Sequence, residues 1–537
     1  MTTRSIRIIT SAAYVEQELA AEFGQIPPSF LSIGVSPLYE AQIKYLGLGD
    51  PIYLTIPEGF SPRRYDQERL HELGVVLVPV PEGLKLGESI VYAINFIAST
   101  SVSVQLLHGD TLIEDLPIGL DDLIAIHDEG DEYSWSAVDL RDGVVAELGS
   151  NMASSGHPGN RPVACGYFVF SNSTLLVRAI TQARGSFIAG LNLYIRDHAT
   201  RGVRVARWYD FGHIQTYFRS RRAITTERAF NSLKISRCSV HKSSTDHSKI
   251  IAEATWFASV PPAVAPYTAR LLEVGQSEGT VFYRTEYRYA PTLAELFVFS
   301  SIGRLTWYKI LRSCEEFLNA CTAHKGPSLA GVALTALAID KTIARLERYS
   351  SESGFDIDKP TSFDGRSLPS LRRVAESATR EIDLRSGCSE TLMHGDFCFS
   401  NILYDSRADR ITVIDPRGHV SAGTASAFGD VTYDLAKLSH SISGQYDHIL
   451  AGRYALRREG SHGFTIGFEA SEHHRWLQHA LSDLRVDGVG AGNRSVRAVT
   501  VSLFLSMLPL HADRPDRQAA FIANALRLYI DLERSKP

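Results

Sequence analysis

The 537-residue sequence predicts two different folds in one chain, an α/β fold for residues 1–220 followed by an α+β fold for residues 225–537. The first prediction rests on short apolar strands that alternate with helical segments. The second rests on a group of antiparallel-strand patterns that precede a mainly helical stretch. A polar, arginine-rich segment at 218–231, FRSRRAITTERAFN, separates the two patterns and predicts a linker.

Four apolar runs predict the strands of the first fold, and they read IRIIT, IYLTI, VVLVPV and VSVQLL. Helical segments such as SPLYEAQIKYLG and LGESIVYAINFIAS lie between them. Continuous apolar strands with intervening helices predict a parallel, doubly wound sheet. Because such sheets bind ligands at the carboxyl ends of their strands, polar residues that directly follow a strand are candidate site residues.

The second fold begins with four runs that resemble antiparallel strands, NSLKIS, CSVHKSS, ARLLEV and VFYRTEYRY. One helix, SKIIAEATWFASV, lies among them. From about residue 292 helices are expected to dominate, interrupted only by the region around residue 394 and by RITVIDP.

Composition excludes several classes of function. The chain is 44% hydrophobic and 21% charged with a net charge of -5, which is ordinary for a soluble globular protein. The sequence contains no block of basic residues of the kind that predicts nucleic-acid binding. The apolar run VSLFLSMLPLHA is too short to cross a bilayer. The N-terminus lacks the apolar core of a signal peptide, and the six cysteines form no C-x-x-C pair. We therefore expect a cytoplasmic protein without membrane insertion; its oligomeric state is not predicted.

The tripeptide His-Gly-Asp occurs twice, and its second copy starts the run HGDFCFSNIL. Asp396 is followed five positions later by Asn401, and Asp415 follows an apolar strand in VIDPRG. Phosphoryl transfer from ATP needs a carboxylate to accept the acceptor's proton, oxygen ligands for Mg²⁺ and a cation on the phosphates. We expect Asp396 to be the base, and Asn401 and Asp415 to hold Mg²⁺. Lys242 on a strand and Glu253 on a helix would form the phosphate-binding pair.

Residues 225–537 resemble the aminoglycoside phosphotransferase/choline kinase family through HGDFCFSNIL, VIDPRG and FGDVTYDLAKLSHS. The resemblance implies a bilobal protein-kinase-like fold, with an N-lobe at 225–290, a C-lobe at 291–537 and ATP bound between the lobes. It implies that Glu286 and Tyr287, in the hinge segment TEYRYAP, contact ATP. It also implies that His394 and Asp434 support the catalytic loop.

Two points about this resemblance stay open. Lys234 and Lys249 lie near Lys242 in the sequence and compete with it for the lysine role. Family members surround cationic acceptors with acidic or aromatic residues, and the runs FDIDKPTSFDGR and SGQYDH are candidates for that purpose.

The first His-Gly-Asp copy follows a strand in LLHGDTLI, so Asp110 is expected at a strand's carboxyl end. It cannot start a kinase loop, because Asp115 stands where the asparagine would be. Residues 5–220 resemble sugar nucleotidyltransferases through LKLGESIVYAINF, LLHGDTLI, VACGYFVFS and RWYDFGHIQTYFRSR. The resemblance implies an α/β Rossmann-like domain in which Asp110 and Asp210 carry Mg²⁺ between two phosphate groups.

The chain departs from this family at its phosphate-binding positions. Ala12 and Ala13 replace glycines of the opening loop, and Ser29 stands roughly where a signature lysine is expected. Four other residues are candidates to supply the missing positive charge on the phosphates, namely Lys85, Arg219, Arg221 and Arg222.

A kinase makes a phosphate monoester and a nucleotidyltransferase consumes one, so the two domains predict consecutive steps. The expected enzyme phosphorylates a small hydroxyl compound (a sugar or amino alcohol) with ATP and then uses a second NTP, CTP or another. The product would be an NDP-activated precursor for surface polysaccharide or lipid synthesis. One alternative is a single-activity kinase with a degenerate, regulatory N-terminal domain. Another is a non-catalytic nucleotide-binding assembly protein.

Overall fold

The computed structural model describes residues 5–47, 49, 51–98, 101–129, 135–149, 161–224, 231–277, 279–326, 331–384, 390–421, 424–469 and 471–535. The chain divides into two compact units. Unit 1 comprises Met1–Arg221 with Phe299–Ser301, and unit 2 comprises Arg222–Val298 with Ile302–Pro537. No helix among the described residues has the length and apolar character needed to cross a membrane.

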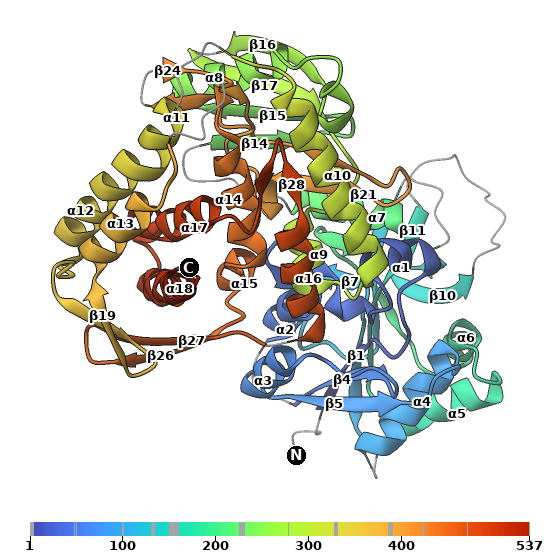
Figure 1. The fold of residues 1–537 in the computed structure, drawn as a ribbon. Coiled ribbons are helices and arrows are strands. Elements are labelled where there is room, and N and C mark those ends of the chain that lie inside the picture. The colour runs from blue at the N-terminus through green and yellow to red at the C-terminus, as the bar shows by residue number, and fades with distance from the viewer. Residues whose placement is uncertain are drawn as a thin grey trace. The chain divides into compact units, whose positions relative to one another are not determined.

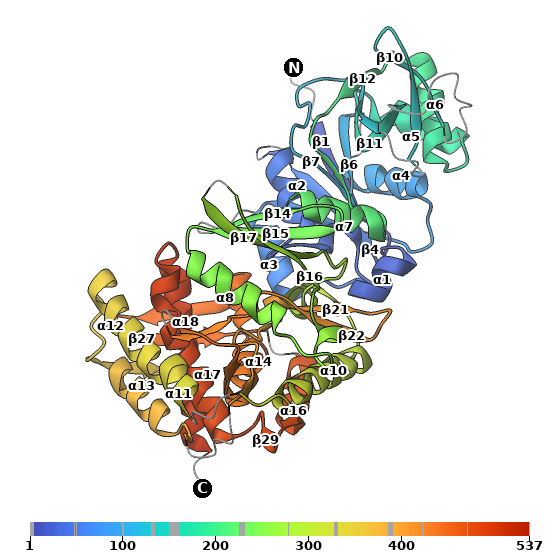
Figure 2. The same ribbon diagram turned by 90° about the horizontal axis from the view of Figure 1, so that it is seen from above.

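Among the described residues of unit 1, nine strands form one mixed sheet in the order β5-β4-β1-β6-β11-β8-β12-β10-β9. Their bounds are β1 (Ser5–Thr10), β4 (Ile52–Pro57), β5 (Val75–Val80), β6 (Ser103–His108), β8 (Leu123–Glu129), β9 (Ala137–Arg141), β10 (Val144–Gly149), β11 (Arg161–Phe170) and β12 (Arg201–Arg204). Strands β5, β4 and β1 (Figure 1) and β6 (Figure 2) are mutually parallel and coincide with the four predicted runs. The remainder differs from the parallel sheet that was predicted, because β11 runs antiparallel to both β6 and β8.

Helices and short strand pairs complete unit 1. They are α1 (Gln17–Phe23), η1 (Pro28–Phe30), α2 (Leu38–Leu46), α3 (Arg64–Glu72), α4 (Leu86–Ile97), α5 (Ser173–Gln182), α6 (Phe187–Asp197), α7 (Ile214–Ala223), β2 (Ser32–Ile33) with β3 (Ser36–Pro37), and β7 (Thr111–Ile113) with β13 (Trp208–Asp210). Apolar side chains of α4, α5 and α6 pack with those of β1, β5 and β6 in one buried core. The linker prediction was wrong for residues 218–223, because they form the last turns of α7. Residues 225–230 of that segment lie outside the described part of the chain.

Unit 2 begins with an antiparallel sheet in the order β14-β15-β17-β16, as the strand patterns predict. The bounds are β14 (Asn231–Ile235), β15 (Ser239–Ser244), α8 (His247–Ala258), η2 (Ala265–Tyr267), β16 (Leu271–Ser277) and β17 (Thr280–Glu286). Helix α8 lies along this sheet (Figure 2). The Asp246 side chain caps α8 by accepting the Lys249 N–H.

The rest of unit 2 is mainly helical. Its helices are α9 (Leu293–Phe299), α10 (Arg304–Thr322), α11 (Val332–Leu334), the π-helix η3 (Thr335–Asp340), α12 (Lys341–Ser353), α13 (Leu371–Arg380), η4 (Phe399–Asn401), α14 (Val431–Ile442), α15 (Tyr446–Leu450), α16 (Glu472–Asp483), α17 (Arg494–Ser506), η5 (Leu508–His511) and α18 (Pro515–Arg534). Helix α17 packs against both α14 and α18 (Figure 1). It is buried on almost every face, and the hydroxyls of its buried Thr500, Ser502 and Ser506 donate to backbone carbonyls of the same helix.

Strands interrupt this helical region more often than predicted. Residues far apart in the chain form a sheet in the order β19-β18-β27-β26, with bounds β18 (Pro360–Phe363), β19 (Arg366–Ser370), β26 (Ala455–Glu459) and β27 (Gly463–Gly467). Short pairs are β20 (Thr391–Leu392) with β25 (Phe428–Gly429), β21 (Ile402–Asp405) with β22 (Arg410–Val413), β23 (His419–Ser421) with β24 (Thr424–Ala425), and β28 (Arg485–Val486) with β29 (Val489–Gly490). The expectation that only two regions would interrupt the helices was therefore wrong.

Candidate functional site

The second His-Gly-Asp copy forms a tight turn fixed by helix α14. The carboxylate of Asp434 accepts the backbone N–H groups of His394 and Gly395, each at 2.8 Å. Gly395 has a φ of +76°, and a Cβ atom at this position would lie 2.8 Å from the Cβ of Arg417. Glycine is therefore required both by the left-handed backbone and by the close approach of Arg417. Asp430 caps α14 by accepting the Thr432 N–H at 2.8 Å.

His394 is fully buried and bonded on both ring nitrogens. Its Nδ1 accepts the Asp396 N–H at 3.2 Å, and its Nε2 lies 3.0 Å from the carbonyl oxygen of Ile414. A carbonyl only accepts hydrogen bonds, so the proton resides on Nε2 and the ring is neutral. Burial lowers the pKa of His394 to about 4, which keeps this form at neutral pH.

Asp396 presents both carboxylate oxygens to partners from other parts of unit 2. One oxygen lies 2.7 Å from Nζ of Lys437, and the other accepts from Nδ2 of Asn401 at 3.1 Å. Burial acts to raise the pKa of Asp396, but the positive charges of Lys437 and Arg417 outweigh it and hold this pKa well below its usual range. Arg417 is fixed beside the loop, because its Nε donates to the Gly395 carbonyl at 2.9 Å. Asp396 is therefore ionised, and its side chain is 33% exposed.

Asn401 and Asp415 lie on neighbouring segments of the same loop system. The Ile414 N–H donates to the Asn401 carbonyl at 3.0 Å, which brings the residue before Asp415 against η4. The amide nitrogen of Asn401 donates to Asp396, and its oxygen, which has only a 3.5 Å contact with Ser400 Oγ, is the atom that could hold a cation. Asp415 follows β22 and has a φ of +54°, a left-handed conformation that aspartate tolerates better than most residues. Its Oδ1 lies 3.0 Å from Nζ of Lys242.

Lys242 lies within β15 and is buried between two carboxylates. Its Nζ is 2.8 Å from Oε2 of Glu253 on α8, and the hydroxyl of Tyr283 donates to the same oxygen at 2.9 Å. Burial alone would lower the pKa of Lys242, but the charges of Asp415 and Glu253 raise it. Lys249 is more exposed and lies 3.9 Å from Glu253. Lys234 is exposed, so of the three lysines the structure places Lys242 in the interior with Glu253 and Asp415.

The residues predicted for the hinge, Glu286 and Tyr287, lie at the end of β17. Oε1 of Glu286 accepts the Arg270 N–H at 2.9 Å and forms an ion pair with Nη2 of Arg288 at 2.6 Å. The Tyr287 N–H donates to the Cys238 carbonyl at 2.9 Å. Glu286 is the last residue of β17 and Tyr287 follows it, so both lie at the end of the antiparallel sheet. The Glu286 carboxylate is already paired with Arg288.

Sequence reasoning missed three residues of this site, namely Lys437, Arg417 and Tyr283. Lys437 is three residues after Asp434 on one helix, so the two side chains share a face. A lysine one helical turn after Asp434 in the run YDLAKLSHSI was the available signal. Arg417 stands inside the VIDPRG motif, whereas nothing in the sequence singles out Tyr283 among the aromatic residues.

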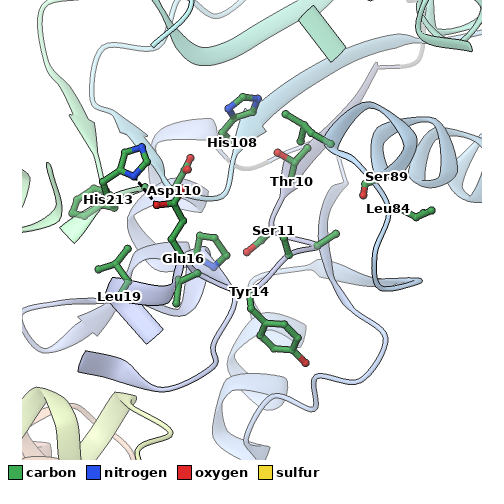
Figure 3. Close-up of a pocket in the computed structure, with 17 residues that line it drawn as sticks. Thr10, Ser11, Tyr14, Glu16, Leu19, Leu84, Ser89, His108, Asp110 and His213 are labelled. Carbon is green, nitrogen blue, oxygen red and sulfur yellow. Dashed lines mark hydrogen bonds and ion pairs between the residues drawn. The ribbon is translucent and has the colours of Figure 1, made fainter. Parts of the chain in front are cut away.

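Unit 1 contains a pocket of about 250 Å³ at the carboxyl ends of β1 and β6 (Figure 3). The loop from Ser11 to Glu16 lines one side, and His108, Asp110 and His213 line another. His213 Nδ1 lies 2.7 Å from a Glu16 carboxylate oxygen, as the dashed line in Figure 3 shows. The first His-Gly-Asp copy therefore ends a strand beside a cavity, as predicted for a doubly wound sheet.

Asp110 and Asp210 converge beside Gly212. A Cβ atom at Gly212 would lie 2.8 Å from Oδ2 of Asp110 and 3.3 Å from Oδ1 of Asp210. Burial raises the pKa of Asp110, and burial together with the Asp110 charge raises the pKa of Asp210. Trp135 was not predicted, and its Nε1 donates to Oδ2 of Asp210 at 3.1 Å. Two close carboxylates with raised pKa values form a site that a divalent cation would stabilise.

The departures seen in the opening loop are visible in the pocket. Ala12 and Ala13 line it, whereas Ser29 is not among the lining residues; it is buried, with Oγ donating to the Gly109 carbonyl at 3.2 Å. The lining residues within the described part of unit 1 include no lysine or arginine. Lys85 instead begins α4, and Arg219 lies over the Trp135 ring with Cζ 5.5 Å from its centroid. Arg221 and Arg222 are on α7 and do not line the pocket either.

His, Cys, Asp and Glu side chains do not gather in groups of three or more that could hold a metal anywhere in the described ranges. Each candidate Mg²⁺ site instead offers two oxygen ligands, Asn401 with Asp415 in unit 2 and Asp110 with Asp210 in unit 1. Mg²⁺ commonly binds one or two carboxylates and completes its shell with water and substrate phosphates. Both pairs fit that pattern.

Comparison with known proteins gives one family match. Residues 334–467 match the Phosphotransferase enzyme family, a range that contains Asp396, Asn401, Asp415 and Asp434 but neither Lys242 nor Glu253. No curated protein matches the chain.

Solved structures similar to this chain include three that are matched over at least 94% of their own length. HddC from Yersinia pseudotuberculosis is 16% identical, with 42% of this chain and 100% of that chain covered and a TM-score of 0.31. A thermostable mutant of aminoglycoside phosphotransferase APH(4)-Ia, solved with AMP-PNP and hygromycin B, is 15% identical over 58% of this chain and 94% of that chain, with a TM-score of 0.37. A 4-diphosphocytidyl-2C-methyl-D-erythritol synthase is 13% identical over 42% and 100%, with a TM-score of 0.26. The predicted resemblance of the C-terminal region to phosphotransferases is confirmed by the family match at residues 334–467.

Proposed function

We propose that unit 2 transfers the γ-phosphoryl group of ATP to the hydroxyl group of a small molecule. The observation that carries this proposal is the convergence of Asp396, Asn401 and Asp415 with the buried Lys242–Glu253 pair. These residues come from two segments more than 140 positions apart, and together they supply a base, two cation ligands and a phosphate-binding ammonium group. The protein-kinase-like division into an N-lobe at 225–290 and a C-lobe at 291–537 belongs to this proposal.

The chemistry follows from the protonation states in the site. The ionised Asp396 accepts a hydrogen bond from the acceptor hydroxyl and orients its oxygen toward the γ-phosphorus. As the new O–P bond forms, the hydroxyl proton passes to Asp396 and the bond to the β–γ bridging oxygen breaks, its electron pair leaving with ADP. Because a carboxylate of such low pKa is a weak base, Asp396 receives the proton late and mainly positions the hydroxyl.

The cationic groups control the donor. Lys242 is held by Glu253 and Asp415, and its ammonium group binds the α- and β-phosphates of ATP in the proposed complex. Asn401 and Asp415 would hold Mg²⁺, which would supply positive charge to the phosphates of the donor. Backbone groups near Glu286 and Tyr287 contact the adenine, because the Glu286 carboxylate is already paired with Arg288.

We propose further that residues 1–220 form a Rossmann-like nucleotidyltransferase domain. The parallel order β5-β4-β1-β6 and the pocket at the ends of β1 and β6 support it. The convergence of Asp110 and Asp210 supports Mg²⁺-dependent joining of a phosphate monoester to a second NTP, CTP or another. The chain is then a bifunctional cytoplasmic enzyme that makes an NDP-activated precursor for surface polysaccharide or lipid.

One observation favours the alternative in which unit 1 only binds or regulates. The described lining of its pocket carries acidic groups at Glu16 and Asp110 but no lysine or arginine. A triphosphate bound there would depend on Mg²⁺ and backbone N–H groups for charge compensation. This feature makes the second activity the weaker of the two proposals on physical grounds.

The test incubates the full chain with ATP, Mg²⁺, each second NTP and a panel of sugars, amino alcohols and their phosphorylated forms. Mass spectrometry should detect first a phosphate ester and then a nucleotide conjugate. Asp110→Asn should stop the reaction at the phosphate ester. Asp115→Asn alters a carboxylate outside the pocket and should not stop it. Accumulation of the ester with every NTP would support the regulatory alternative. Nucleotide binding without any ATP turnover would support a non-catalytic assembly protein.

A further inference from the structure

Four cations extend from the proposed base Asp396 into the helical part of unit 2, and we call them the cation cluster: Lys341, Arg345, Arg417 and Lys437. Lys341 and Arg345 are one turn apart on α12, so they share a face. Lys437 is on α14, and Arg417 follows the segment that carries Asp415. The cluster therefore draws on three separate parts of the chain.

Tyr433 joins the members of the cluster. Its buried ring has Nζ of Lys341 at 5.8 Å and Cζ of Arg417 at 5.9 Å from the centroid, and its hydroxyl lies 3.2 Å from Nζ of Lys341. Lys437 and Arg417 also border the catalytic loop, through Asp396 Oδ1 at 2.7 Å and the Gly395 carbonyl at 2.9 Å. A continuous path of positive groups therefore leads from Asp396 to Lys341.

The cluster has fewer negative charges than positive ones around it. Lys437 pairs with Asp396, and the charges of Asp396 and Asp434 also act on Arg417, so four cations face two carboxylates. Lys341, Arg345 and Arg417 form no direct ion pair with a carboxylate among the residues described. Arg345 instead donates to the Ser506 carbonyl at 3.1 Å. Burial lowers the pKa of Lys341 well below its ordinary value, and the charges of Arg417, Lys437 and Arg345 lower it further. His419 also faces Arg417, and burial with that charge lowers its pKa.

Holding like charges together in a partly buried region is unfavourable unless an anion is bound there. The backbone next to the cluster is unusual as well. A π-helix, Thr335–Asp340, directly precedes Lys341 and fixes where α12 begins. Such π-helical turns are frequent at functional sites.

We propose that the acceptor of unit 2 is an anionic hydroxyl compound, whose phosphomonoester or carboxylate group binds Lys341, Arg345 and Arg417 while its hydroxyl lies at Asp396. This inference rests on the proposed kinase function and names its substrate class. It reverses the expectation of a cationic acceptor held by acidic residues. One acidic run that was expected to hold a cationic acceptor, FDIDKPTSFDGR, contains Asp358, and this residue is already paired with Arg372. The transfer step itself is unchanged: the acceptor oxygen gains the γ-phosphoryl group, its proton passes to Asp396, and ADP leaves.

Direct binding tests the anion site without requiring turnover. The full chain is saturated with AMP-PNP and Mg²⁺, so that the donor phosphates are already in place, and is titrated with inorganic phosphate, acetate or choline in a calorimeter. Phosphate or acetate should bind the wild type, and choline should not. Lys341→Met and Arg345→Met should each weaken anion binding at least tenfold, with phosphate and acetate distinguishing a phosphomonoester site from a carboxylate site.

A matched control lies on the same helix. Arg348 is exposed and pairs with Glu352 on the helix surface, so Arg348→Met should leave anion binding unchanged. Circular dichroism of the three variants distinguishes loss of the site from loss of fold, and Lys341→Gln provides a second neutral side chain if the methionine variant unfolds. Anion binding that is equal in wild type, Lys341→Met and Lys341→Gln overturns the proposal, as does preferential binding of choline.

Turnover distinguishes this inference from the function on which it rests. With glucose, glucosamine, glucose 6-phosphate and glucuronate as acceptors, the charged anions should be preferred, and Lys341→Met should raise their KM tenfold or more while the KM for ATP stays constant. Phosphorylation of neutral or cationic members with an unchanged KM in Lys341→Met would leave the kinase function standing and refute the anionic acceptor. Lys341-dependent phosphate binding in a chain that transfers no phosphate from ATP would refute the kinase function instead.

Discussion

The carboxylate of Asp434 binds the backbone N–H groups of both His394 and Gly395 at 2.8 Å, so one side chain of α14 fixes the turn that carries Asp396. Burial raises the pKa of Asp434 to about 7, and the two N–H donors oppose that rise. A carboxylate can accept both hydrogen bonds, whereas an amide offers one oxygen and a repelling NH₂ group. The geometry of the proposed base therefore depends on the chemical identity of this residue.

Replacing Asp434 with asparagine should reduce both activity and stability. We expect a loss of about 1–3 kcal/mol in the free energy of unfolding, because a buried N–H loses its partner, and a fall in kcat of about a hundredfold as Asp396 loses its position. Urea unfolding and steady-state kinetics measure the two effects. Asp430→Asn is the control on the same helix, since asparagine also caps helices well. Equal effects in both variants would contradict the bracing role.

Gly395→Ala should destabilise unit 2 more than a glycine replacement at another left-handed position. At Gly460 the φ is +64° and nothing lies within 4 Å of an added Cβ, so Gly460→Ala isolates the backbone cost, about 1 kcal/mol. Gly395→Ala adds a clash at 2.8 Å with Arg417 and should cost about 1–3 kcal/mol more. Chemical denaturation of both variants measures the difference. Equal losses in the free energy of unfolding for the two variants would contradict the close approach of Arg417 to Gly395.

Asp447 provides a pH-dependent test of burial in unit 2. Burial raises its pKa from 3.8 to about 7, so between those values the folded state retains a proton that the unfolded state has released. Stability contributed by this group is therefore highest below pH 4 and falls as pH rises to about 7. Asp447→Asn should remove this penalty, and its stability relative to wild type should improve by roughly 2–4 kcal/mol between pH 4 and pH 8.

Asp409→Asn is the matched control for the pH series, because its effect has the opposite sign. Asp409 is bonded to Lys309 and Tyr404 at the surface, and these bonds lower its pKa. Its contribution to stability is present above the unfolded pKa and is lost as pH falls through the folded value. The asparagine variant should therefore lose a little stability at neutral pH. A flat difference between Asp447→Asn and wild type across the pH range would contradict the burial argument.

Mg²⁺ should stabilise unit 1 through Asp110 and Asp210. Their carboxylates repel each other, so Asp110→Asn should raise the thermal midpoint of unit 1 in EDTA and should abolish any further rise with Mg²⁺. Differential scanning calorimetry with and without Mg²⁺ reads this effect independently of activity. A wild-type midpoint that does not respond to Mg²⁺ would contradict the proposed cation site.

The sequence was informative where function depends on short local patterns. The strands of the parallel half of unit 1 and the antiparallel sheet of unit 2 were predicted, because their apolar runs are bounded by turn residues. The pairing of Lys242 with Glu253 was also predicted, since a strand lysine and a helix glutamate eleven positions apart can meet only if the helix packs on the sheet. Local spacing was enough in these cases.

Long-range pairing was not predictable in the same way. Strand β18 pairs with β27, about a hundred positions later, and neither run is more apolar than the surrounding loops. The antiparallel β11 beside β6 was missed because a continuous apolar strand has no directional signal. The cation cluster depends on the fold bringing Lys341 and Arg417 to one tyrosine, and single lysines and arginines in a sequence are usually solvent-exposed.

The central claim, that Asp396 serves phosphoryl transfer from ATP, is tested most directly by the rate of ATP-dependent acceptor phosphorylation in Asp396→Asn. Asp409→Asn is the control, because it makes the same chemical change outside the site. The account predicts that Asp396→Asn lowers kcat by roughly a hundredfold or more while ATP still binds, since base catalysis and hydroxyl positioning typically contribute that much. It also predicts that Asp409→Asn retains the wild-type rate. Wild-type turnover in Asp396→Asn would contradict it.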